Sequence, residues 1–247
     1  MKKSNRSGYR SESWKQLQKI IALGHSRDKV FHDWLDLMLV SALALKDNVS
    51  RLNLDFTKFD GKYEDQYHKI NARYDNGGKQ GERPIDYFTK AYAALIQEIN
   101  ETDKDVLGDI YMLEITYGEH GQVFTPEHIT DMMAMIVSPS KSEECREVVC
   151  DPCCGSGRML LSAHKHNPNA FLVGIDLDPR CAKMCALNLI LREMEGDVYC
   201  GNSLMGKMDT VWMIRNGWVQ EQEKPETPDR IKNLTEEETE QLSLLAA

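Results

Sequence analysis

Residues 148–161 read VVCDPCCGSGRMLL, and this stretch decides the fold expected for the second half of the chain. It opens with three apolar residues that suit a buried strand, and it leads into a helical run over residues 158–165. Between them, Gly155 and Gly157 allow a sharp turn and let the backbone approach a ligand with no Cβ in the way. The stretch therefore predicts a strand, a ligand-binding turn and a helix.

The same alternation continues downstream. Residues 171–175 are apolar and precede a helical run over residues 179–192, and residues 197–200 precede another glycine turn. Residues 210–214 form a fourth apolar run. Strands that alternate with helices predict an α/β fold with a parallel, doubly wound sheet, whose ligand lies at the carboxyl ends of the strands.

The first 120 residues have the three-to-four-residue apolar spacing of helices instead. This spacing predicts helices over residues 28–46, 64–74, 84–99 and 103–116, with Asp103 as the N-cap of the last one. Residues 75–81 are expected to form a glycine-rich loop. We expect an all-helical region over residues 1–120, a ligand-binding domain over 121–220, and an acidic linker with a short terminal helix over 221–247.

Composition limits the class of protein. The 247 residues are 41% hydrophobic, which is ordinary for a globular protein, and they contain neither a run of about 18 apolar residues nor an apolar export signal. We expect a cytoplasmic protein with no membrane partner. The seven cysteines are expected to be reduced thiols. A zinc site of Cys150, Cys153, Cys181 and Cys185 is an alternative, but small buried thiols and no metal are the simpler expectation.

The charge is unevenly distributed. The formal net charge of -9 is unfavourable for DNA binding, which relies on lysine and arginine at phosphates. Residues 1–30 are basic, however, and the chain from Glu221 onward is acidic. The basic N-terminus permits DNA contact, although a solvated surface explains most runs of charge equally well.

Two motifs resemble one family. An acidic strand end followed by Pro-x-x-Gly-Ser-Gly resembles the first motif of the amino methyltransferases, in the form used by adenine-N6 DNA methylases. Upstream, residues 121–126 read GQVFTP, which is similar to the segment that precedes this motif in the modification subunits of type I restriction systems. Helix initiation by Thr125 and Pro126 explains part of that segment. The resemblance covers about residues 100–205 and implies a Rossmann-like class I sheet that binds S-adenosylmethionine (SAM).

Polar residues at the strand ends fit such a cofactor. Asp176 ends the second strand, where a carboxylate can accept hydrogen bonds from both ribose hydroxyls, while Asp178 would cap the next helix. Asn202 matches the family's residue at the adenine ring, although a plain turn is the alternative. The resemblance places Asp151 and residues 124–126 at the methionine end. The expected cofactor-binding set is Phe124, Thr125, Pro126, Asp151, Pro152, Gly155, Gly157, Asp176 and Asn202.

The family's base-handling motif is not intact. Asn/Asp-Pro-Pro-aromatic occurs nowhere in these residues, and the chain reads Arg215-Asn216-Gly217-Trp218 after the fourth apolar run. Asn216 and Trp218 are either a degenerate remnant of the motif or, as Asn-Gly favours, a plain turn. The sequence therefore predicts cofactor binding without establishing methyl transfer.

The expected sheet is also incomplete. Four strands are counted where this class has seven, and no target-recognition region follows, so one sheet edge is expected to be open to the tail, to another copy or to a partner subunit. The predicted function is the SAM-binding module of an adenine-N6 DNA methyltransferase, with DNA and other methylase or specificity subunits as partners. Two alternatives stay open: a non-catalytic accessory or decoy relative, and a methyltransferase for a substrate other than DNA.

Overall fold

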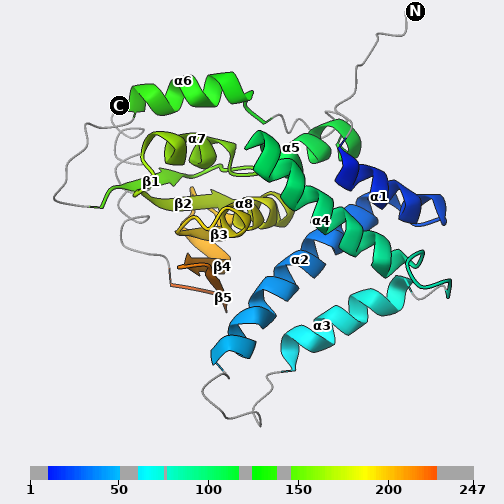
Figure 1. Ribbon diagram of the computed structural model, residues 1–247. Coiled ribbons are helices and arrows are strands. Elements are labelled where there is room, and N and C mark those ends of the chain that lie inside the picture. Colours follow the sequence, from blue (N-terminus) through cyan, green and yellow to red (C-terminus); the bar gives the residue numbers. More distant parts are fainter. Residues whose placement is uncertain (1–10, 51–60, 75–76, 117–123, 138–145, 227–247) are drawn as a thin grey trace, which may run out of the picture.

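The computed structural model describes residues 11–50, 61–74, 77–116, 124–137 and 146–226 (Figure 1). Helices make up the described residues before Phe124, and one sheet with its helices makes up those after it. The helices before Phe124 are α1 (Glu12–Ala22), α2 (Arg27–Ser50), α3 (Lys62–Asn71), α4 (Pro84–Thr102) and α5 (Val106–Ile110), with short turns η2 (Ala72–Tyr74) and η3 (Tyr111–Ile115) after α3 and α5. The later elements are α6 (Glu127–Val137), β1 (Val148–Asp151), α7 (Arg158–His166), β2 (Phe171–Asp176), α8 (Pro179–Leu191), β3 (Gly196–Asn202), β4 (Lys207–Arg215) and β5 (Trp218–Glu223).

The five strands form a mixed sheet in the order β1-β2-β3-β4-β5, so the described fold is α/β. Strands β1, β2 and β3 are parallel, with Asp151 opposite Gly174 and Asp176 opposite Cys200. Strand β4 is antiparallel to β3, and β5 is antiparallel to β4. The expectation of a parallel sheet was wrong for β4, and β5 is a fifth strand that the sequence did not predict. Only residues 203–206 separate β3 from β4, and a parallel crossover needs a dozen or more residues.

The described helices cover one face of the sheet. Helices α7 and α8 make the two crossovers between the parallel strands, and both lie on the face of Gly174, where a Cβ would meet Leu160 of α7 and Cys185 of α8. Helix α2 continues this layer against α8 and β5. Leu172, Val198, Ile214 and Val219 are buried there in one core with the N-terminal helices. A doubly wound sheet, with helices on both faces, is thus not what the described residues show.

The first helix was not expected. Its buried residues Trp14, Leu17 and Ile20 form a stripe along one face, and Ser11 caps it by accepting a hydrogen bond from the backbone N–H of Trp14. Helix α1 packs against α4, and the carboxylate of Glu98 accepts hydrogen bonds from Ser11 and Ser13. A stripe this short among polar residues is a weak signal in the sequence.

The cap of α5 was assigned to the wrong residue. Asp103 ends α4 in a left-handed conformation, with φ of 53°. Asp105 is the N-cap of α5, and its carboxylate accepts from the backbone N–H of Gly108. Both aspartates suit a cap by type, but only Asp105 stands three residues before an N–H that needs an acceptor.

Other expectations fall partly outside the described residues, among them the terminal helix over 234–245, the loop residues 75–76, and Gly121 and Gln122. The linker predicted from Glu221 was wrong at its start, because residues 221–223 belong to β5. None of the helices in the described ranges combines the length and the apolar character that crossing a membrane requires.

Candidate functional site: the carboxyl ends of the parallel strands

The loop after β1 is held in a shape that needs its glycines. The backbone N–H of Cys154 donates to the carbonyl of Ile175 at 2.8 Å, which ties the loop to the end of β2. Gly155 and Gly157 have φ of 55° and 88°, values that favour glycine. A Cβ on Gly157 would lie 2.8 Å from the Sγ of Cys185. Glycine is therefore required at Gly157 both by the backbone and by the helix packed beneath it.

Two carboxylates at the strand ends organise the same loop. Asp176 accepts from the backbone N–H of Gly155 at 2.8 Å and from that of Asp178 at 2.9 Å. Asp151 accepts from the backbone N–H of Cys153 at 3.1 Å. Each carboxylate oxygen can accept more than one hydrogen bond, so these contacts leave acceptor capacity for a ligand.

Burial raises the pKa of both carboxyl groups. Burial raises the pKa of Asp151 above its ordinary value, and the nearby charge of Asp176 adds to the rise. Burial also raises the pKa of Asp176, against the lowering effect of its two backbone hydrogen bonds. Two half-buried carboxylates of like charge make a site that favours a positively charged ligand.

The end of β3 adds an amide and apolar surface. Asn202 accepts from the backbone N–H of Met205 at 3.0 Å, so its oxygen closes the turn to β4, and its NH₂ group takes no part in this bond. The side-chain oxygen of Asn202 thus makes the turn contact that was the alternative to a role at the adenine ring. Leu177, Leu204 and Met205 follow the strand ends and are 68%, 77% and 77% exposed. The sequence analysis did not single out these three, whose signal was an apolar residue one to three positions after a polar strand end.

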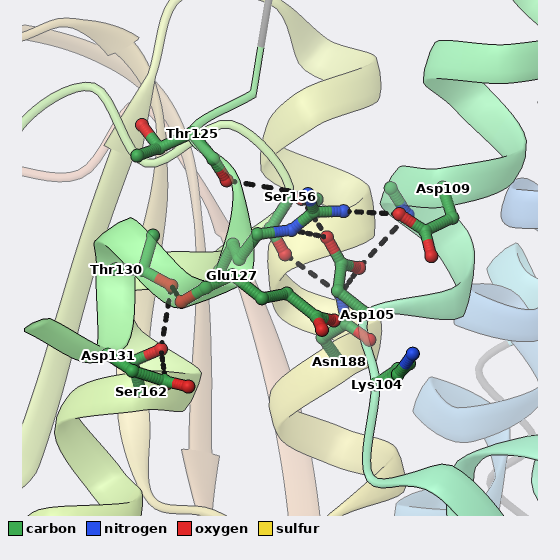
Figure 2. A network of polar contacts seen from close by, with 12 residues as sticks. Lys104, Asp105, Asp109, Thr125, Glu127, Thr130, Asp131, Ser156, Ser162 and Asn188 are labelled. Carbon is green, nitrogen blue, oxygen red and sulfur yellow. Dashed lines mark hydrogen bonds and ion pairs between the residues drawn. The ribbon is translucent and has the colours of Figure 1, made fainter.

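The segment 124–126 lies against the loop. A Cβ on Gly155 would come within 2.9 Å of the ring of Phe124, so the ring packs directly on the loop backbone. The ring of Phe124 also stacks on that of Tyr111, with centroids 5.7 Å apart. The carbonyl of Thr125 accepts from Arg158, the first residue of α7, at 3.4 Å (Figure 2). Pro126 begins α6 by accepting from the backbone N–H groups of Ile129 and Thr130.

A cleft of about 480 Å³ adjoins the loop. It runs along β1 and is bordered by α6 and α7, and Thr125, Asp151, Pro152 and Cys153 line one end of it. Asp176 and Asn202 do not line it. We call the surface formed by the carboxyl ends of β1, β2 and β3, at Asp151, Asp176 and Asn202, the shelf. The cleft and the shelf meet at Asp151 and Pro152.

Asn216 and Trp218 lie at the opposite end of the sheet. Asn216 and Gly217 have φ of 48° and 75° and form a two-residue turn between β4 and β5, with Arg215 opposite Trp218. The backbone N–H of Asn216 donates to Glu195, just before β3 begins. Strand β4 runs antiparallel and carries its end away from Asp151, so Asn216 and Gly217 occupy the turn position that was the alternative to a catalytic remnant.

The cysteines show a pair of buried thiols beneath the loop. Cys154 and Cys185 are both buried, and the sulfur of Cys185 raises the pKa of the Cys154 thiol, as does burial. Cys153 is exposed. Among the described residues, no group of three or more His, Cys, Asp or Glu side chains has the arrangement needed to hold a metal ion.

The structure thus brings residues 124–126, Asp151, Pro152, Gly155, Gly157, Asp176 and Asn202 to one end of the sheet and places Asn216 and Trp218 at the other. Sequence reasoning also missed Asp105, which accepts hydrogen bonds from the loop residue Ser156 and from Arg158 at the start of α7. These partners are distant in the sequence, so only the spacing of Asp105 to Gly108 was a usable signal.

Known proteins resemble this chain over the same region. The N-6 DNA Methylase family model matches residues 102–225, half of the chain, from just before α5 to just after β5. The type I restriction enzyme MjaVIII methylase subunit of Methanocaldococcus jannaschii is 33% identical over 119 residues, which are 44% of this chain and 20% of that protein. The type II restriction enzyme and methyltransferase RM.BcgI of Heyndrickxia coagulans is 32% identical over 129 residues, again 44% and 20%.

Two further similarities come from the same kind of system. The type I restriction enzyme MjaVII methylase subunit of Methanocaldococcus jannaschii is 28% identical over 128 residues, 47% of this chain and 21% of that protein. The crystal structure of a type I restriction-modification system methyltransferase subunit from Streptococcus thermophilus superposes with a TM-score of 0.41 and 13% identity, over 78% of this chain and 57% of that one. The matched part is about a fifth of the length of the three relatives matched by sequence. From the match of its motif-bearing half, the chain belongs to the N-6 DNA methylase family.

Proposed function

We propose that the chain binds SAM on the shelf formed by the ends of β1, β2 and β3, as the cofactor half of a Rossmann-like class I methyltransferase. The observation that carries the proposal is the hydrogen bond from the Gly155 N–H to the carboxylate of Asp176. It joins the glycine loop of the family's first motif to the acidic strand end of the second. Membership of a methylase family supports SAM-dependent chemistry.

The residues present fit this cofactor. SAM carries an ammonium and a sulfonium group, and the half-buried carboxylates of Asp151 and Asp176 favour a cation. Asp176 would accept hydrogen bonds from the ribose hydroxyls. The NH₂ group of Asn202 would donate to a ring nitrogen of the adenine, and the exposed Leu177 would cover a face of the ring. When bound, SAM supplies an activated methyl group.

We further propose that the complete activity is methyl transfer to the N6 of adenine in DNA. The amine must lose a proton as the new N–C bond forms, and its lone pair is delocalised, so an oxygen acceptor has to face both amine hydrogens. These 247 residues contain no Asn/Asp-Pro-Pro-aromatic string. A partner subunit or another part of a longer methylase would therefore supply that acceptor. DNA and other modification or specificity subunits are the proposed partners, in the cytoplasm.

The proposed organisation keeps a boundary near residue 120. The change from helices to alternating strands and helices supports a division into residues 1–120, 121–220 and 221–247. The first two parts share a buried core, since Phe31 and Trp34 of α2 belong to the same cluster as Cys185 and Leu189 of α8. We therefore infer that the helical part and the cofactor half act as one unit. Strand β1 is the sheet edge at which another copy or subunit would pair.

Titration calorimetry with SAM tests the proposal. Binding by the purified chain at a stoichiometry of one is expected, and no detectable heat with a folded chain would contradict it. Transfer of a tritiated methyl group to DNA, measured with and without a modification subunit, then separates two functions. Labelled DNA supports a methyltransferase, whereas binding without labelling under either condition supports the accessory role that the position of Asn216 favours.

A further inference from the structure

We propose that Asp105, which caps a helix of the N-terminal half, is the positioning residue that sets the shape of the SAM-binding loop. The inference rests on the proposed function, because it concerns the same loop. Asp105 would not touch the cofactor. It would act through Ser156 and Arg158, the residues on either side of Gly157.

Four donors converge on one buried carboxylate. Asp105 is 1% exposed. Its Oδ1 accepts from the backbone N–H of Gly108 at 2.9 Å and from the side-chain amide of Asn188 at 2.8 Å. Its Oδ2 accepts from the hydroxyl of Ser156 and from Nε of Arg158 at 3.1 Å. Figure 2 shows Ser156 and Asn188 beside Asp105.

The loop is held from both its side chain and its backbone. Asn188, which bonds to Asp105, also donates to the carbonyl of Ser156 at 2.8 Å. Ser156 is therefore fixed by its hydroxyl on one partner and by its carbonyl on another. Because Ser156 lies between the two glycines with positive φ, these two contacts restrain the part of the loop that is otherwise the most free.

Arg158 extends the restraint to the segment 124–126. Its Nη2 donates to Asp109 of α5 at 2.8 Å, and its Nη1 donates to the carbonyl of Thr125. Burial disfavours the guanidinium charge, but Asp105 and Asp109 outweigh burial and raise the pKa of Arg158. One cation thus connects α5, the start of α7 and the segment that packs on Gly155.

The packing leaves little room for another arrangement. A Cβ on Gly108 would lie 2.0 Å from Oδ2 of Asp105 and 2.6 Å from the hydroxyl of Ser156. Helix α5 therefore approaches the loop as closely as backbone allows. It follows that a displacement of α5 would displace Ser156 and Arg158 with it.

Replacement of Asp105 by Asn releases Arg158 selectively. An amide nitrogen at the Oδ1 position would face two N–H donors, those of Gly108 and Asn188. At the Oδ2 position it would face Ser156, whose hydroxyl can accept instead, and Arg158, which cannot. The amide therefore keeps the cap of α5 and the contact with Asn188, and it loses the contact with Arg158.

A second buried aspartate provides the matched control. Asp33 is 4% exposed and accepts from Arg73 at 2.6 Å and from the hydroxyl of Tyr74 at 2.7 Å. All three residues belong to the helical half, and the hydrogen bonds of Asp33 in the described part of the chain are made to these partners and not to the loop residues 151–157. Asp33→Asn removes a buried charge of the same kind, so it reports any general cost of such a change on SAM binding.

The experiment is a double-mutant cycle for SAM affinity, measured by calorimetry on the full chain. Asp105→Asn and Arg158→Lys are each expected to weaken binding about tenfold, and the double variant is expected to be no weaker than either, because both remove one linkage. Asp33→Asn alone should bind SAM as tightly as the wild type does. Asp33→Asn combined with Arg158→Lys should bind as tightly as Arg158→Lys alone. Unchanged affinity in folded Asp105→Asn, or effects that multiply in the double variant, would overturn the proposal.

A milder pair covers the case in which Asp105→Asn does not fold. Ser156→Ala removes only the hydroxyl donor to Asp105 and is expected to weaken SAM binding about threefold to fivefold. Ser162→Ala is its control, since Ser162 is also buried and bonds to Thr130 and Asp131 outside the loop (Figure 2). Equal affinity of these two variants would overturn the proposal. Failure of the wild type to bind SAM is a separate outcome, which contradicts the proposed function itself.

Discussion

The three parallel strands and the hairpin of β4 and β5 belong to one sheet but differ in what their ends carry. At the carboxyl ends of β1 and β2, acidic side chains hydrogen-bond to the loop that follows β1. At the far end of the hairpin, Asn216 and Gly217 only reverse the chain, and Gly217 has nothing within 4 Å of where a Cβ would be. The carboxyl ends of β1 and β2 thus combine acidic side chains with a closely packed loop, whereas the hairpin turn has neither.

The difference shows where the chain can bind a cofactor. A crossover returns each parallel strand to the same end of the sheet, so polar residues after β1 and β2 converge. A hairpin sends the next strand back, so the residues after β4 arrive at the other end. Any function that needs residues after β4 beside Asp151 would require a different connection.

The largest expected effect is on stability, and it is seen by substituting one glycine with positive φ in each region. Gly157→Val is expected to lower the free energy of unfolding by about 2–4 kcal/mol, because strain in the backbone adds to a clash with Cys185. Gly217→Val should cost about 1 kcal/mol, since only the backbone is strained. Urea titrations give both values. Equal losses would show that the loop is no more tightly packed than the hairpin.

The next effect concerns the ligand. Asp176→Ala is expected to weaken SAM binding by about 1–3 kcal/mol, because the ribose hydroxyls and the Gly155 N–H lose their acceptor. Asn216→Ala is the control from the hairpin and should leave the affinity unchanged. Calorimetry on both variants decides, and normal binding by Asp176→Ala would remove this residue from the site.

The pH dependence of SAM binding is a smaller effect. The pKa of Asp151 is raised in the folded chain, so protonation begins at a higher pH than for an ordinary carboxyl. SAM binds the carboxylate, so its affinity should fall as the pH is lowered from 7 to about 5 and should recover as the pH rises again. The dissociation constant across this range is the measurement. A flat profile in the wild type would contradict a direct role for the charge of Asp151, and Asp151→Asn should make the profile shallower, with the remaining dependence due to Asp176, whose pKa is also raised.

The smallest effect is expected at the hairpin aromatic. Trp218 is 38% exposed at the start of β5. Trp218→Ala should lower the free energy of unfolding by about 1 kcal/mol or less and leave SAM affinity as it was. A loss of SAM binding in a folded variant would mean that the hairpin end takes part in the site after all.

The parallel half could be predicted from the sequence because its signals are local. The helix starts at Arg158 and Pro179 and the cap at Asp178 follow from glycine, proline and aspartate at set positions, and all three are confirmed. The polar strand ends could be predicted from the same glycine, proline and aspartate positions. Their roles in binding SAM stay predictions.

The rest depends on pairing and on contacts between distant residues. The apolar run in β4 indicates a strand, but not its direction, which follows from the short connection after Asn202. Ser156 reads as a small residue in a glycine loop, and nothing local shows that it bonds to Asp105, 51 positions earlier. The contact from Asn188 spans 83 positions. Such contacts depend on how α5 and α8 pack, which no local pattern encodes.

The central claim is that SAM binds at the carboxyl ends of the parallel strands and not at the hairpin. Titration of the isotopically labelled chain with SAM, followed through backbone amide resonances, tests it most directly. Shifts are expected at Gly155, Gly157, Asp176 and Asn202, with none at Asn216 or Gly217. Saturable shifts at the hairpin turn with an unperturbed loop would contradict the account.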